Sequence, residues 1–245
     1  MNVKLLAHTQ LSESFYNEII GEIQQWSRHP KDGQVISHTA IRCCYSPNKP
    51  TEIIGLEGKK YFDSKATDGK SGTEADRLFR HITGSGHQST LEHLNYTFAI
   101  EGVSRALMAQ LTRHRHLSFS IKSQRYVRFG SNDKSGGFGY VVPETVKEKG
   151  YEATNEFDNI MASIQQSYDR LRQLGVPSED SRSVLPNAAT TDIVMTGNLR
   201  TLLDFYSKRK PGSGAQQEIA QLADGIKNEI LKVDEWLAPY FENSH

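Results

Sequence analysis

Residues 113–126 read RHRHLSFSIKSQRY, and this stretch is the most informative part of the 245-residue chain. It lies inside a window, residues 102–132, that holds no aspartate or glutamate. The chain as a whole has a formal net charge of zero, with 29 basic and 29 acidic residues. A neutral protein with one strongly basic segment indicates a local anion site and not a generally cationic surface.

The side chains of this stretch suit a ligand that carries phosphate. If RHRH (113–116) closes a helix, successive side chains point about 100° apart, so some of them must face solvent or a ligand. Arginine forks match phosphate and carboxylate oxygens, and imidazole can donate a hydrogen bond to them. The Ser-Gln-Arg of residues 123–125 adds donors suited to a phosphate or a pyrimidine edge. The alternative is a basic helix end that complements the helix dipole.

Local sequence patterns predict both strands and helices. Apolar and alternating runs predict strands at 3–8, 94–100, 140–143 and 190–196. Helical spacing and caps predict helices at 33–45, 76–84 and 154–174, after Ser104, after Asn198, and at 219–237. Residues 46–74 are rich in glycine, lysine, aspartate and proline, and are predicted to be a loop or an insertion. Strands and helices mix without regular βαβ alternation, so the class is α+β, and no linker divides residues 1–245 into two domains.

Composition excludes several kinds of protein. The two cysteines, Cys43 and Cys44, are adjacent, so neither a disulfide framework nor a zinc site of spaced pairs is expected. No apolar run is long enough to span a bilayer, and the N-terminus lacks the apolar core of a signal peptide. A cytoplasmic protein without a membrane partner is therefore expected.

Four segments together resemble the flavin-dependent thymidylate synthases, the ThyX family. Residues 113–126 match its signature of R-H-R, a serine three residues on, and S-x-R-Y. GHQSTLEH (86–93) is similar to its G-H-x-S-x-L-E-H segment, and residues 182–205 to its R-x-x-L-P-N…G-N-x-R segment. Arg209 stands at the family's late arginine. The resemblance covers roughly residues 80–235, with weaker similarity at 3–8 and 40–47.

The resemblance implies a single domain with a mixed, largely antiparallel sheet flanked by long helices. It implies that the chain converts dUMP to dTMP. Methylenetetrahydrofolate would give the one-carbon unit, and NADPH would reduce the FAD that supplies the hydride. Arg209 would be catalytic, because a fixed cation stabilises the uracil ring as N3 loses its proton. Family members work as homotetramers with shared active sites, so the same assembly is expected here.

The resemblance also assigns the binding residues. Those expected to hold dUMP are Gln110, Arg113, Ser123, Gln124, Arg125, Arg182 and Arg209. Those expected to hold FAD are His87, Ser89, Arg113, His114, Arg115, Asn198, Arg200 and Asp204. Ser123 can be interpreted as a nucleophile, but a binding role is preferred because no general base is evident beside it in sequence.

Two positions depart from the family pattern. Ile121 stands where the family usually has glutamate or glutamine. Asp204 stands where a histidine or asparagine flavin contact is common, and its charge would repel FAD phosphates, so an arginine partner is the alternative. These departures leave weak activity or an altered substrate open.

Two of the assigned segments have simpler interpretations, and the glycine-rich stretches match no known motif. His87, Glu92 and His93 suggest metal ligands, but the defined zinc patterns are absent, so no metal is expected and a turn with satisfied histidines is the alternative. Asn198 and Arg209 fall on nearly one helix face, about 16 Å apart, which also fits an N-cap and a surface arginine. The glycine-rich stretches match no dinucleotide-binding pattern, so a bound flavin would not be held by a Rossmann fold.

The main rival function is nucleic-acid binding through the basic and aromatic segment 113–129. Phe119, Tyr126 and Phe129 would stack on bases while the arginines bind phosphates. Zero net charge and the match of four segments weigh against it, so no nucleic-acid partner is expected. The other rivals are a flavoprotein of this fold that reduces a different substrate and a catalytically silent homologue.

Overall fold

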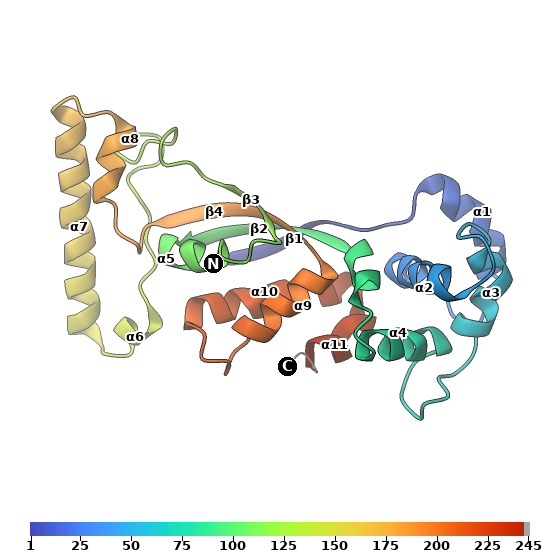
Figure 1. The fold of residues 1–245 in the computed structure, drawn as a ribbon. Helices are drawn as coiled ribbons and strands as arrows, with labels where there is room; N and C mark the ends of the chain where they lie inside the picture. Colours follow the sequence, from blue (N-terminus) through green and yellow to red (C-terminus); the bar gives the residue numbers. More distant parts are fainter. Residues whose placement is uncertain (243–245) are drawn as a thin grey trace. The chain divides into compact units, whose positions relative to one another are not determined.

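In the computed structural model, which describes residues 1–242, four strands form one sheet. They are β1 (Asn2–His8), β2 (Asn95–Ser104), β3 (Ser118–Ile121) and β4 (Thr190–Asn198), in the order β1-β2-β4-β3. β3 runs antiparallel to β4, with Ser118 opposite Thr196 and Ile121 opposite Ile193. Helices supply most of the remaining structure, so the predicted α+β class is confirmed (Figure 1).

The helices follow the expected caps and periodicity in most places. The α-helices are α1 (Glu13–Ile23), α2 (Asp32–Tyr45), α3 (Ile53–Phe62), α4 (Glu74–Gly84), α5 (Arg105–Leu111), α6 (Glu144–Lys147), α7 (Tyr151–Gln173), α8 (Ser178–Ser181), α9 (Leu199–Arg209), α10 (Gln217–Val233) and α11 (Ala238–Glu242). Shorter 3-10 helices are η1 (Gln88–His93), η2 (Arg182–Val184) and η3 (Glu235–Leu237). Within residues 1–242, no helix combines the length and the apolar character needed to cross a membrane.

The chain folds into two compact units, and each is built from separate stretches of sequence. The first unit contains residues 1–5, 98–196 and 205–227. The second unit contains residues 6–97, 197–204 and, within the described part, 228–242. The expectation of a single domain over residues 1–245 stays a prediction.

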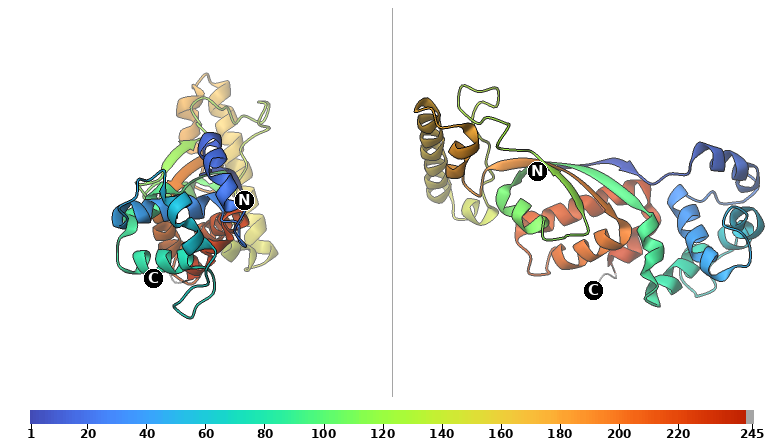
Figure 2. Two further views of the ribbon diagram at one scale, coloured as in Figure 1. Left: turned by 90° about the vertical axis from the view of Figure 1, so that its right-hand side faces the viewer. Right: turned by 45° about the horizontal axis from the view of Figure 1, so that its top comes forward.

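The first unit holds most of the sheet's buried residues and the helices that pack on them. Its core is formed by Phe98, Ile100, Val103, Leu107, Leu111, Ile193, Met195, Phe205, Ile219, Leu222 and Ile226. Gly225 brings α10 close to β1, because a Cβ there would lie 3.1 Å from a methyl carbon of Val3. The views agree that α9 and α10 lie side by side and that α8 lies beside α7 (Figures 1 and 2). Gly175, with φ of 86°, follows α7 as predicted for its stop.

The second unit gathers α1, α2, α3 and α4 around a core of its own (Figure 2). This core includes Ile19, Ile23, Trp26, Val35, Ile54, Tyr61, Phe62 and Ala75. The prediction that residues 46–74 form a loop is wrong for Ile53–Phe62, which is helix α3. Ile53, Ile54 and Phe62 are buried there. Gly58 belongs to this packing, because a Cβ at that position would collide with the ring of Trp26.

Two other predicted elements differ from the structure. The expected strand at 140–143 is reduced to one bridge between Tyr140 and Ala189, because Pro143 immediately starts helix α6. The last helix was expected to continue to 237, but α10 ends at Val233. The break falls at Asp234, whose buried carboxylate accepts hydrogen bonds from Tyr96 Oη at 2.7 Å and from Trp236 Nε1 at 2.8 Å.

The replacement Asp234→Ala is expected to lower the free energy of unfolding by about 2 kcal/mol, because it leaves the buried Tyr96 hydroxyl and the half-buried Trp236 indole N–H without an acceptor. Urea denaturation of the purified protein measures this loss. Glu235→Ala is the matched control, because Glu235 is the adjacent acidic residue and is exposed. Equal stability of the two variants would contradict the role given to Asp234.

Candidate functional site

Every residue predicted to hold dUMP lies in the first unit. The residues predicted to hold FAD are divided between the units. Arg113, His114 and Arg115 lie in the first unit. The others lie in the second: His87, Ser89, Asn198, Arg200 and Asp204.

The turn that carries RHR begins where α5 ends. Ser104 caps α5 by accepting a hydrogen bond from Leu107 N at 3.0 Å, as the sequence predicts. The helix stops at Leu111, so RHRH follows the helix and does not close it. Arg113 and Arg115 are exposed, whereas His114 between them is partly buried. The alternation presents two arginine side chains to solvent or a ligand and turns the imidazole inward.

His114 and Arg209 form the most specific contact among the predicted residues. Arg209 is the last residue of α9, and its Nε donates a hydrogen bond to Nε2 of His114 at 3.2 Å. The same imidazole packs edge-on against Phe205, with ring centroids 5.0 Å apart. The expected catalytic arginine and one expected flavin contact are therefore neighbours in the first unit.

The Ser-Gln-Arg segment follows the short strand β3. Lys122 pairs with Asp192 of β4 and anchors the end of β3. Burial raises the pKa of Asp192, but the Lys122 ammonium and the Gly102 N–H outweigh it and hold that pKa below its usual value. Ser123 Oγ then accepts a hydrogen bond from Arg125 N at 3.2 Å and shapes the turn.

Gln124 is a buried amide whose Nε2 has no hydrogen-bond partner in the described part of the chain. Leaving such a donor unpaired costs about 1–3 kcal/mol. A polar ligand that accepts a hydrogen bond from it would remove this cost. Gln124 therefore has the property expected of a residue that completes its bonding with a ligand.

The structure brings Arg125 and Arg182 to one acidic residue. Arg125 Nε forms an ion pair with Glu179 Oε2 at 2.6 Å, and Arg182 Nε donates to the backbone oxygen of Glu179 at 2.9 Å. Sequence reasoning did not single out Glu179. Its place three residues before Arg182 at the start of a short helix is a local signal, but its partner Arg125 is known only from the fold.

Gln110, the remaining residue predicted for the nucleotide, lies on α5 and donates to Gln216 Oε1 at 2.6 Å.

The rival nucleic-acid interpretation of 113–129 needs accessible aromatic rings. Tyr126 is exposed, but Phe129 is buried and cannot stack on a base. The aromatic component of that alternative is therefore weaker than the sequence indicates.

In the second unit, the GHQSTLEH segment lies beside the start of α9. Leu199 N donates to Leu94 O at 2.7 Å and joins the two segments. Asn198 caps α9 as predicted, with Oδ1 accepting from Thr201 N at 2.9 Å. Arg200 Nη1 contacts Glu92 Oε1 at 2.5 Å. Glu92, which the sequence presented as a candidate metal ligand, is instead the partner of an expected flavin-binding arginine.

His87 has a partner that sequence reasoning missed. Tyr45 Oη lies 2.9 Å from His87 Nδ1, and the two rings meet edge to face. Tyr45 ends the segment AIRCCY, whose weak similarity to the family was the available signal. Ser89 and Asp204 are both exposed. Among residues 1–242, no group of three or more histidine, cysteine, aspartate or glutamate side chains is arranged to hold a metal ion.

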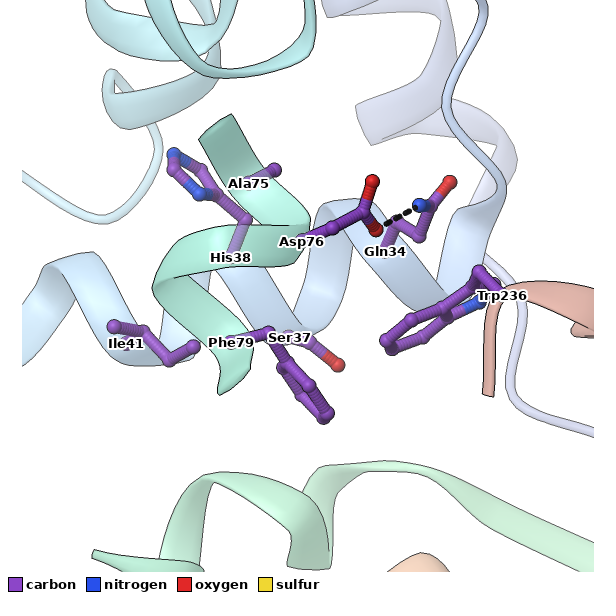
Figure 3. Close-up of a pocket in the computed structure, with 8 residues that line it drawn as sticks. All are labelled: Gln34, Ser37, His38, Ile41, Ala75, Asp76, Phe79 and Trp236. Carbon is purple, nitrogen blue, oxygen red and sulfur yellow. Dashed lines mark hydrogen bonds between the residues drawn. The ribbon is translucent and has the colours of Figure 1, made fainter. Parts of the chain in front are cut away.

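A pocket in the second unit lies apart from these assignments. Figure 3 shows its lining from α2 and α4 together with Trp236. The lining residues are Gln34, Ser37, His38, Ile41, Ala75, Asp76, Phe79 and Trp236. None of them belongs to the residues predicted to bind FAD or dUMP, and Gln34 and Asp76 hydrogen-bond each other across it at 3.1 Å. The pocket is therefore not assigned to the nucleotide.

Comparison with known proteins decides the family. Residues 25–235 match the family model described as thymidylate synthase complementing protein. A flavin-dependent thymidylate synthase of Geobacter sulfurreducens is 37% identical over 212 residues, which cover 86% of this chain and 82% of that protein. The chain belongs to the flavin-dependent thymidylate synthase family. The family expected from the four segments is thus confirmed.

Other members of the flavin-dependent thymidylate synthase family give the same result. The one from Clostridium tetani is 33% identical over 220 residues, covering 83% of this chain and 80% of that protein. The fold also matches the crystal structure of the UMP/dUMP methylase PolB from Streptomyces cacaoi, bound with 5-Br dUMP. That match has a TM-score of 0.69 at 19% identity and covers 100% of this chain and 97% of the other, so it supports the fold alone.

Proposed function

We propose that this chain is a thymidylate synthase that converts dUMP to dTMP by reductive methylation. Methylenetetrahydrofolate gives the one-carbon unit, and NADPH is the reductant. The observation that carries this proposal is the assembly, in one compact unit, of a basic turn, a buried unpaired amide and a late arginine in a chain of this family. The relatives at 33–37% identity carry the name of the activity.

The residues present fit an FAD cofactor. Arg113, Arg115 and Arg200 are exposed cations, and FAD carries a pyrophosphate that such forks can bind. Arg200 is held by Glu92, so the flavin phosphate would share or displace that contact. Asp204 would oppose a phosphate placed beside it. When bound, FAD supplies the hydride that completes the methyl group.

The residues of the first unit bind dUMP. Arg125 and Arg182 bind the 5′-phosphate, and the Arg125–Glu179 contact is exchanged for the phosphate contact when dUMP enters. Gln124 donates its buried amide to an acceptor on the nucleotide. Ser123 binds and does not attack, because its Oγ shapes the turn by accepting from Arg125 N.

Arg209 acts on the uracil ring in this scheme. Its guanidinium stabilises the negative charge that develops when N3 loses its proton, which lowers the barrier to attack by the ring on the one-carbon unit. We further propose a homotetramer with shared sites, since several large ligands must be bound by a chain of this size. A cytoplasmic location stays a prediction.

The test is a single assay of dTMP formation with dUMP, methylenetetrahydrofolate, NADPH and FAD. We expect the purified protein to be yellow, to make dTMP, and to show a change in flavin absorbance when dUMP is added. A colourless preparation that fails to take up FAD would refute the flavoenzyme. A yellow protein that oxidises NADPH without making dTMP would favour a flavoprotein with another substrate.

A further inference from the structure

The imidazole of His114 bridges one turn of α9. It packs edge-on against Phe205, at 85° between ring planes, and it accepts a hydrogen bond from Nε of Arg209. Phe205 and Arg209 are four residues apart, so both lie on the same face of the helix. Phe205 is fully buried and fixes the ring, while Arg209 is partly buried and is the last residue of the helix.

This hydrogen bond determines the form of the imidazole. Arginine is a donor only and keeps its proton, so Nε2 of His114 must offer a lone pair. An imidazolium ring has no lone pair to offer. His114 is therefore neutral in this arrangement, with its proton on Nδ1.

A neutral partner leaves the charge of Arg209 intact. A carboxylate in the same place would offset the guanidinium charge and compete with the negative charge that develops on the substrate. An imidazole fixes the direction of the guanidinium through Nε–H alone. The Nη donors of the fork then remain for the substrate.

We propose that His114 is a positioning residue that orients Arg209 toward the uracil ring. This rests on the proposed function of Arg209 and adds to the contact with FAD expected of His114. The orienting hydrogen bond keeps the guanidinium in its productive direction, so losing it lowers the rate of the chemical step more than it weakens dUMP binding.

Two variants separate the acceptor from the ring. His114→Phe keeps an aromatic ring against Phe205 but has no acceptor. His114→Gln brings a carbonyl oxygen near the position of Nε2 and can accept from Arg209. We expect His114→Phe to lower kcat about tenfold with KM for dUMP within about twofold, and His114→Gln to retain most of kcat.

A double-mutant cycle tests whether the loss of kcat in His114→Phe arises only from a lost contact between His114 and FAD. Alanine has no donor for His114, so in an Arg209→Ala background His114→Phe should cause no further loss of kcat. An equal loss in both backgrounds, with reduced flavin content, overturns the proposal. If the unmodified protein makes no dTMP, it is the proposed function that fails.

A second measurement does not depend on turnover. In flavin-free protein, nitrogen-15 NMR should show slow solvent exchange of the Arg209 Nε–H proton. His114→Phe should speed this exchange, and His114→Gln should not. Fast exchange in the unmodified protein overturns the proposal even if catalysis is normal.

Discussion

Replacing Arg209 with alanine is expected to lower the rate of dTMP formation by about 10²–10³-fold while the protein keeps its flavin. The physical reason is the loss of a fixed positive charge beside the ring that becomes anionic. The side chain is partly buried and held by His114, so solvent would replace its charge poorly. Single-turnover formation of dTMP, with flavin absorbance recorded on the same sample, measures both quantities.

Lys208→Ala is the matched control for this prediction. It removes a positive charge from the adjacent position of α9, where the side chain is exposed. We expect its rate to stay within about twofold of the unmodified protein, as for most exposed substitutions. Normal dTMP formation by the Arg209→Ala protein would show that the ring is activated by another group.

Acid is expected to destabilise the second unit through His38. This side chain is 3% exposed and lies against Tyr61 and Phe62, with ring centroids 4.5 and 5.1 Å away. Neither of its ring nitrogens has a hydrogen-bond partner among the described residues. Burial first, and the positive charge of Arg42 second, lower the pKa of His38 to about 4, although Glu57 acts in the opposite direction.

The direction of the pH effect follows from the different pKa of His38 in the folded and the unfolded protein. In the unfolded chain the pKa of histidine is about 6.5, so between pH 6.5 and 4 the unfolded state binds the proton and the folded state does not. The stabilisation from keeping His38 neutral is complete above pH 6.5 and is lost as the pH falls toward 4. The loss across this window is about 3 kcal/mol, measurable by urea denaturation at a series of pH values.

His38→Phe should remove this part of the pH dependence, because phenylalanine fills a similar space among the aromatic rings and binds no proton. The comparison uses the slope of stability against pH, so a change in overall packing does not affect it. His29→Gln, which removes an exposed histidine, should leave the slope unchanged. Parallel loss of stability in the unmodified and His38→Phe proteins would contradict the assignment.

The elements that were predicted from sequence are those with local signals. Ser104 and Asn198 cap their helices through side-chain oxygens close in sequence, and Gly175 follows α7 with a left-handed backbone. α3 was missed because its glycines and lysines resemble a loop until Trp26 is seen to need the space at Gly58. β3 was missed because its four residues become a strand only by pairing with β4, more than 70 residues away.

In the candidate site, too, features with a local sequence signal were predicted, and features that depend on distant residues were not. Family resemblance supplied the residue types of the basic turn, and the buried state of Gln124 adds a reason for a ligand there. The partners Tyr45, Glu92 and Glu179 were not assigned, because each pairs with a residue distant in sequence. No local sequence pattern predicts such pairings. Composition does not distinguish these residues from ordinary surface residues.

The interleaving of the two units has a consequence for inheritance. The chain leaves the first unit after residue 5, returns at 98, leaves again after 196 and returns at 205, so no single cut separates the units. A gene fragment that encodes one unit whole must also carry pieces of the other. Recombination that exchanges one contiguous segment therefore cannot transfer either unit without part of the other.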